Sequence, residues 1–73
     1  MSNRLGPGLV DALRILAEGP RETGRRTDGD KISGHAASAL WKRGLVSREP
    51  TVRMTWIVTI TGRGLLALRE APR

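Results

Sequence analysis

The sequence contains no cysteine, and this absence excludes several kinds of chemistry at once. Without thiols the chain can form no disulfide, no thiolate zinc site and no cysteine nucleophile. The single histidine, His35, would need three carboxylates around it to hold zinc, so we expect no metal site. We expect the fold to depend on packing or self-association, and a cytoplasmic location fits a chain without thiols.

Aromatic residues are almost as scarce, since two tryptophans are present and phenylalanine and tyrosine are absent. Proteins that bind single-stranded nucleic acid stack bases on several aromatic side chains, so this composition disfavours that function. We predict instead that Trp41 and Trp56 pack as a pair, Trp41 at the edge of the core and Trp56 on an inward strand face.

Long hydrophobic runs are also missing. No stretch approaches the ~20 apolar residues that span a bilayer, and the opening residues do not lead into the hydrophobic region of a signal peptide. We therefore expect no membrane partner.

The chain has 73 residues, which suffices for one small domain over residues 1–73 with an ordered core at about 7–71. A core of this size supplies only about 3–5 kcal/mol, so a buried catalytic cavity is difficult to maintain. Neither Ser33 nor Ser38, paired with His35, has an orienting acid, and no glycine-rich phosphate cradle is present. We expect neither an enzyme nor a cofactor.

Acidic residues are outnumbered, with 7 Asp and Glu against 13 Lys and Arg, and the net charge is +6. A polyanion is the natural electrostatic partner of such a protein, because each phosphate that it neutralises releases counterions. Nucleic acid is therefore the leading expected partner.

The first predicted helix spans residues 7–18, where Leu9, Leu13 and Leu16 recur at helical spacing. Pro7 suits the first turn, and the Gly-Pro pair that follows the helix ends it. The apolar arc is wide, which favours burial against the core and also against a second helix or a second subunit.

Residues 20–32 are basic and have no apolar periodicity, so a second helix there would be short or degenerate. Asp28-Gly29 tolerates the positive φ angles of a type I′ turn. This dipeptide predicts a short hairpin between Arg26-Thr27 and Asp30-Lys31.

A helix is predicted over 34–43, capped by Ser33 and ended by Gly44 in a left-handed conformation. On this helix His35, Ser38 and Lys42 lie three to four residues apart and share the side away from the apolar stripe.

After this helix the hydrophobic period changes to two, which predicts a strand over 45–49 and a returning strand over 53–60. Thr61 then caps a last helix over 62–71. The side chains expected to face the core are Met54, Trp56, Val58 and Ile60 on the returning strand, and Leu65 and Leu68, with Leu66 beside them, on the last helix.

The order of helix, polar connector, helix, hairpin and helix resembles that of a winged helix-turn-helix domain. The stretch Leu40-Trp41-Lys42-Arg43-Gly44-Leu45-Val46-Ser47-Arg48 is similar to the exit of that family's recognition helix, where Gly-Leu-Val leads into the wing. The stretch Val58-Thr59-Ile60-Thr61-Gly62-Arg63-Gly64-Leu65-Leu66 is similar to the returning wing strand of MarR-type regulators, which carry an Ile-Thr-x-x-Gly pattern. The resemblance implies a mostly helical α+β fold, a winged helix-turn-helix with three helices and a β-hairpin wing in the C-terminal half.

By this resemblance the protein binds double-stranded DNA as a small bacterial or phage transcription regulator, with helix 34–43 in the major groove and the 45–60 wing on the backbone. A homodimer through the first or the last helix is expected, because one small module buries little surface on DNA. The implied DNA contacts are Ser33, His35, Ser38, Lys42, Arg43, Arg48, Arg53, Arg25 and Arg26.

A different function remains open on the same fold. The basic face would then dock an acidic partner protein, as a phage-encoded inhibitor or an assembly factor does, because a fold does not determine a function. A duplex-DNA binder loses affinity steeply with salt, whereas the interaction module shifts no duplex even at low salt.

Overall fold

The first helix, α1 (Pro7–Ala17), supplies much of the core of the computed structural model, which describes residues 5–70. Pro7 lies in its first turn, as predicted, and the Gly6 carbonyl accepts hydrogen bonds from the backbone N–H groups of Leu9 and Val10. Leu13 and Leu16 are almost fully buried. The chain leaves the helix through Gly19, whose φ of 153° is open to glycine but strained for other residues.

The connector after α1 forms two short strands, β1 (Arg21–Gly24) and β2 (Lys31–Ser33), and no helix. The strands pair in parallel, with Thr23 beside Ile32, so the hairpin predicted around Asp28-Gly29 is wrong. Neither of those two residues has the positive φ that a type I′ turn requires. Asp28 instead accepts hydrogen bonds from the backbone N–H groups of Asp30 and Lys31 and closes a local turn.

The second half of the chain forms α2 (Gly34–Lys42), β3 (Val46–Pro50), β4 (Trp56–Ile60) and α3 (Gly62–Glu70). The sheet order is β2-β1-β4-β3, with β4 antiparallel to both of its neighbours. The predicted α+β class, three helices and C-terminal-half hairpin are confirmed.

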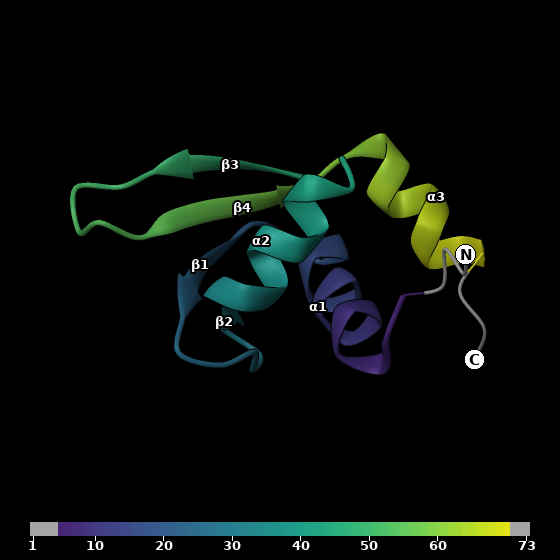
Figure 1. Ribbon diagram of the computed structural model, residues 1–73, viewed down its shortest axis with the longest axis horizontal. Helices are drawn as coiled ribbons and strands as arrows, with labels where there is room; N and C mark the ends of the chain where they lie inside the picture. Colours follow the sequence, from purple (N-terminus) through teal and green to yellow (C-terminus); the bar gives the residue numbers. More distant parts are fainter. Residues whose placement is uncertain (1–4, 71–73) are drawn as a thin grey trace.

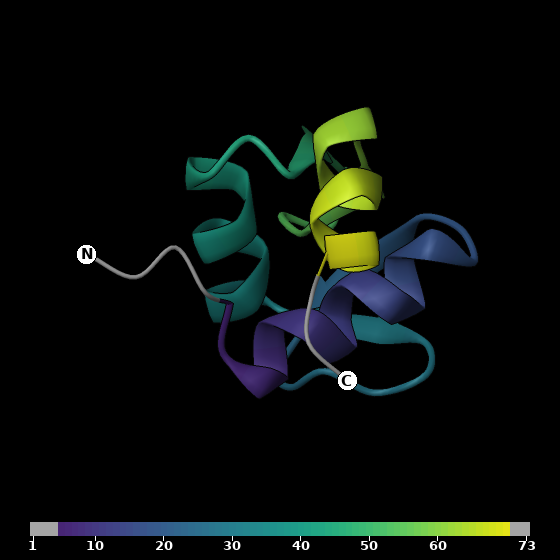
Figure 2. The same ribbon diagram turned by 90° about the vertical axis from the view of Figure 1, so that its right-hand side faces the viewer.

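The helices gather at one end of the molecule, and the β3–β4 hairpin projects from them (Figure 1). Seen along the hairpin from the helical end, α1, α2 and α3 surround the point from which it leaves (Figure 2). One hydrophobic core joins them, and its buried members are Ala12, Leu13, Leu16, Ile32, Ala36, Ala37, Leu40, Leu45, Val46 and Val58.

α3 is held against the base of the hairpin by its first residues. The Thr61 hydroxyl accepts a hydrogen bond from the Gly64 backbone N–H and donates one to the Gly44 carbonyl, which confirms the predicted cap. Gly64 is the buried residue of α3, whereas Leu65 is 46% exposed and Leu66 54% exposed. The predicted inward positions of Leu65 and Leu66 are therefore wrong, whereas that of Leu68 is confirmed, because the helix turns Gly64 and Leu68 towards the core.

The returning strand is shorter than predicted, since β4 begins at Trp56 and residues 51–55 form the hairpin turn. Met54 lies in this turn at a φ of 63° and is 94% exposed. The prediction that Met54 faces the core is wrong, because the strand alternation on which it rested begins only after the turn.

None of the helices between residues 5 and 70 has the length and apolar character required to cross a bilayer.

Candidate nucleic-acid interface

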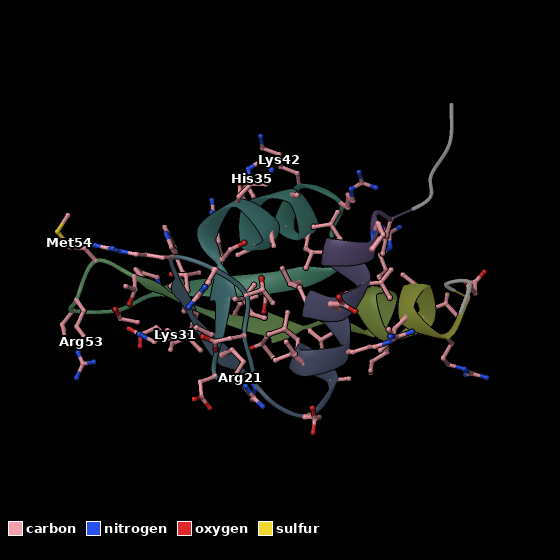
Figure 3. All side chains as sticks on the ribbon, turned by 90° about the horizontal axis from the view of Figure 1, so that it is seen from below. Arg21, Lys31, His35, Lys42, Arg53 and Met54 are labelled. Atoms are coloured by element: carbon pink, nitrogen blue, oxygen red, sulfur yellow. The ribbon has the colours of Figure 1, made fainter. Side chains whose placement is uncertain are left out.

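The outward face of α2 carries three of the side chains singled out in the sequence. His35 and Lys42 are exposed and Ser38 is half-buried, and together with Arg43 they line a shallow groove of about 370 Å³. In Figure 3 His35 and Lys42 project from the same side of the molecule. The small side chain of Ser38 between them leaves this face open to close approach.

Ser33 has a different position, at the start of α2. Its side-chain oxygen accepts a hydrogen bond from the Ala36 N–H at 3.1 Å, and its own N–H donates to the Thr27 hydroxyl at 3.1 Å. The predicted cap is confirmed. Because the hydroxyl oxygen serves the helix, Ser33 orients α2 rather than adding to its outward face.

The end of α2 is equally well defined. The Gly44 N–H donates to the Trp41 carbonyl and the Leu45 N–H to the Leu40 carbonyl, with Gly44 at a φ of 73°. This is a Schellman motif, and it confirms the predicted left-handed cap. Arg43, the residue before it, is exposed at the helix exit.

Arg48 is enclosed by the two tryptophans. Its Cζ lies 4.0 Å from the ring centroid of Trp41 and 4.5 Å from that of Trp56. Trp56 packs against the hydrophobic core, which confirms its predicted inward position. Trp41 is 45% exposed and lies outside the core, so its predicted position is wrong, and the Arg48 guanidinium lies over both rings. This position is favourable for the positively charged guanidinium, because the electron-rich face of each tryptophan ring attracts a cation.

Arg53 lies at the tip of the hairpin and is exposed. Figure 3 shows Met54 on the side of the tip that also bears His35 and Lys42, and Arg53 turned towards the opposite side. The structure therefore does not bring Arg53 together with the outward face of α2.

A network of hydroxyl groups fixes the shape of this tip. The Thr51 hydroxyl oxygen accepts hydrogen bonds from the backbone N–H groups of Arg53 and Thr55, and it lies 2.7 Å from the Thr55 hydroxyl. Thr55 in turn donates to the Glu22 carboxylate on β1. That hydrogen bond, together with the charges of Lys31 and Arg53, holds the pKa of Glu22 below its ordinary value.

The basic loop contains Arg25 and Arg26, both exposed. The loop is held to the body by Arg21, whose side chain donates to the Gly29, Gly19 and Pro20 carbonyls at 3.0 Å each. In Figure 3 Lys31, the first residue of β2, lies apart from His35 and Lys42.

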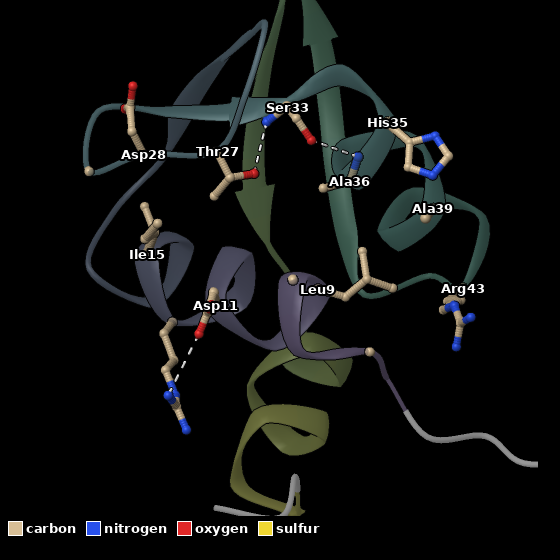
Figure 4. A pocket seen from close by; sticks show the side chains of 14 residues that line it. Leu9, Asp11, Ile15, Thr27, Asp28, Ser33, His35, Ala36, Ala39 and Arg43 are labelled. Atoms are coloured by element: carbon tan, nitrogen blue, oxygen red, sulfur yellow. Dashed lines mark hydrogen bonds and ion pairs between the residues drawn. The ribbon is translucent and has the colours of Figure 1, made fainter.

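The sequence did not predict a second, larger groove of about 960 Å³ between α1 and α2. Leu9 and Ile15 of α1 face Ala36 and Ala39 of α2 across it, with Asp28 at one end (Figure 4). The hydrogen bonds from the Asp30 and Lys31 N–H groups hold the pKa of Asp28 below its ordinary value. No local sequence pattern predicts this groove, because it forms between α1 and α2, which are separated in the chain by β1, β2 and the loop that joins them.

In the part of the chain that the structure describes, no group of three or more His, Asp or Glu side chains is placed to hold a metal ion. Comparison of the chain with models of protein families, with curated proteins and with solved structures found no match.

Proposed function

We propose that this protein binds duplex DNA with α2 in the major groove and the β3–β4 hairpin beside the phosphate backbone, as a small bacterial or phage transcription regulator. The order of α1, a connector that contains β1 and β2, α2, the β3–β4 hairpin and α3 supports this, because a hairpin also follows the recognition helix in the family that the sequence resembles. It would act by occupying its site, without chemistry.

The outward face of α2 is the observation that carries the proposal. None of the nine residues of α2 is acidic. The exposed side of the helix presents His35, Ser38 and Lys42, with the small residue Ala39 among them. With its side chains an α-helix is about 10–12 Å across, and this diameter fits the ~12 Å width of the major groove. His35 and Ser38 suit hydrogen bonds to base edges, and Lys42 suits a guanine or a phosphate.

The basic residues around α2 would supply the phosphate contacts. Arg43 at the helix exit is the nearest to the outward face, and Arg25, Arg26 and Arg53 would act at longer range through the net charge of +6. Such contacts set the position of a protein on the duplex, whereas base contacts set its specificity.

A gel shift with a pool of random duplex sequences, run from 50 to 200 mM salt and followed by sequencing of the bound fraction, tests this function. We expect binding that weakens steeply with salt. Lys42→Ala should lower the slope of log affinity against log salt by about 1. Arg69→Ala, which removes the same charge from exposed α3, is the matched control and should change the slope little.

The absence of any shift at the lowest salt would contradict duplex binding. That result would favour the interaction module instead, with the basic face docked on an acidic protein.

A further inference from the structure

Arg48, Trp41 and Trp56 come from β3, α2 and β4 and meet beside the β3–β4 ladder. The Arg48 guanidinium lies 4.0 Å and 4.5 Å from the two ring centroids, which is within cation–π range of both. A guanidinium that stacks on aromatic rings turns its flat face towards them. Its N–H groups lie in the plane of the group and remain at the edge.

Those N–H groups have no acceptor within the described chain. Between residues 5 and 70, Arg48 makes neither a side-chain hydrogen bond nor an ion pair, whereas Arg21 satisfies its guanidinium with three backbone carbonyls. Arg48 is half-buried and Trp41 is exposed, so the edge of the stack can be reached from solvent.

The stack borders the outward face of α2. Trp41 follows Ser38 by three residues, so the two side chains are neighbours on the helix surface. Arg48 pairs with Val58 and Pro50 with Trp56, which places Arg48 and Trp56 on the same side of the hairpin. A duplex that meets Ser38 would therefore bring its backbone close to Arg48.

We propose that Trp41, Arg48 and Trp56 form a preorganised phosphate site, in which Arg48 binds a backbone phosphate of duplex DNA and the two tryptophans are positioning residues. This inference rests on the proposed function. An exposed arginine must lose side-chain freedom when it binds, whereas a stacked one already holds its planar fork in place. The planar fork matches two phosphate oxygens at once.

The protein contains two tryptophans, both in this site, so its intrinsic fluorescence reports on the site directly. Titration of the whole chain with duplex DNA at low salt should shift that emission and protect it from acrylamide. A gel shift over the same salt series supplies the affinity and the salt slope.

Three variants separate the charge of Arg48 from its stacking. Arg48→Gln should weaken binding and lower the salt slope by about 1. Both Arg48→Lys and Trp41→Leu keep the charge, but the first loses the planar fork and the second loses one of the two rings. They should weaken binding about three- to thirty-fold while the slope stays unchanged. Arg69→Gln removes a charge from α3 and serves as the control, and a thermal melt shows that each variant folds.

Duplex binding by the wild-type chain that Arg48→Lys and Trp41→Leu leave unchanged would overturn the phosphate site while the DNA-binding function stands. Loss of slope in Arg69→Gln equal to that in Arg48→Gln would overturn it too, because the effect would then be one of net charge. A wild-type chain that binds no duplex would overturn the proposed function itself, and this inference with it.

Discussion

At Gly64 the backbone of α3 lies close to the residues that follow α2. A Cβ at this position would overlap the Leu45 carbonyl oxygen and would lie 2.6 Å from Ile60 Cγ1. The backbone of Leu45 cannot move aside, because its carbonyl also accepts the Thr61 N–H and its N–H bonds to the Leu40 carbonyl. A residue without a side chain is therefore required here.

We expect Gly64→Ala to lower the free energy of unfolding by about 1–3 kcal/mol, the usual range for overpacking a core. Urea denaturation followed by circular dichroism measures it. The control is Gly62→Ala in the same helix, where a Cβ meets open space and the change should be neutral or stabilising by up to about 1 kcal/mol. Equal losses in both variants would contradict this account of Gly64.

Met54 carries backbone strain, because its φ of 63° lies in the left-handed region that favours glycine and asparagine. Its side chain is 94% exposed and contributes little packing. We expect Met54→Gly to raise the free energy of unfolding by about 0.5–1 kcal/mol, since the relief of strain exceeds the added chain entropy. Val52→Gly has no such strain to relieve and should lose stability, so a thermal melt in which both variants lose it would refute the prediction.

At the scale of elements, the tip of the hairpin is linked to β1 by one carboxylate. The hydrogen bond from Thr55 lowers the pKa of Glu22 in the folded state below its unfolded value. A carboxyl group whose pKa is lowered in the folded state stabilises the fold at pH values above its ordinary pKa. This contribution disappears as the pH falls through the lowered pKa. Asp28 acts in the same direction.

We therefore expect the melting temperature to fall as the pH drops below about 4. Thr55→Val removes the hydrogen bond to Glu22, so this variant should be less stable at pH 6 and should lose less on acidification than the wild type. Thr59→Val on the exposed side of β4 is the matched control. If Thr55→Val and the wild type had parallel pH profiles, the link between Thr55 and Glu22 would not contribute.

The element boundaries that sequence could predict are those set by local chemistry. Ser33, Gly44 and Thr61 act on backbone groups within a few residues, so their caps could be recognised without knowledge of the fold. The pairing of β1 with β2 depends on a parallel register between distant residues and on β4 beside them, and Asp28-Gly29 pointed locally to a different turn.

One part of the candidate site could likewise be predicted from the sequence, and the other part could not. The shared face of His35, Ser38 and Lys42 follows from helical spacing alone. The stacking of Arg48 on both tryptophans requires the register of β3 on β4 and the distance from the hairpin to α2, which no local pattern supplies.

At the scale of the whole molecule, α1 and α3 differ as surfaces for self-association. The core takes up one part of the wide apolar arc of α1, where Ala12, Leu13 and Leu16 are buried, and Leu9 and Ile15 line the groove between α1 and α2. α3 leaves Leu65 and Leu66 about half exposed. We propose α3 as the dimer contact, because a two-fold axis would place these leucines of two copies together.

Analytical ultracentrifugation should then find a species of twice 8.0 kDa at high protein concentration. The double change of Leu65 and Leu66 to Ser should return the chain to the monomer mass. Val52→Ser, which alters a fully exposed apolar side chain at the hairpin tip, should leave the dimer intact. A wild-type sample that sediments only at 8.0 kDa would rule the dimer out.

The strand order leaves β3 at one border of the sheet and β2 at the other. An edge strand has unpaired backbone N–H and C=O groups that can pair with another extended chain. Proteins reduce this risk of aggregation with charged residues, proline or very short edge strands. β3 ends in Arg48, Glu49 and Pro50, and β2 has three residues. These features disfavour the addition of further strands at both edges of the sheet, so we expect a concentrated solution of this protein to resist fibril formation.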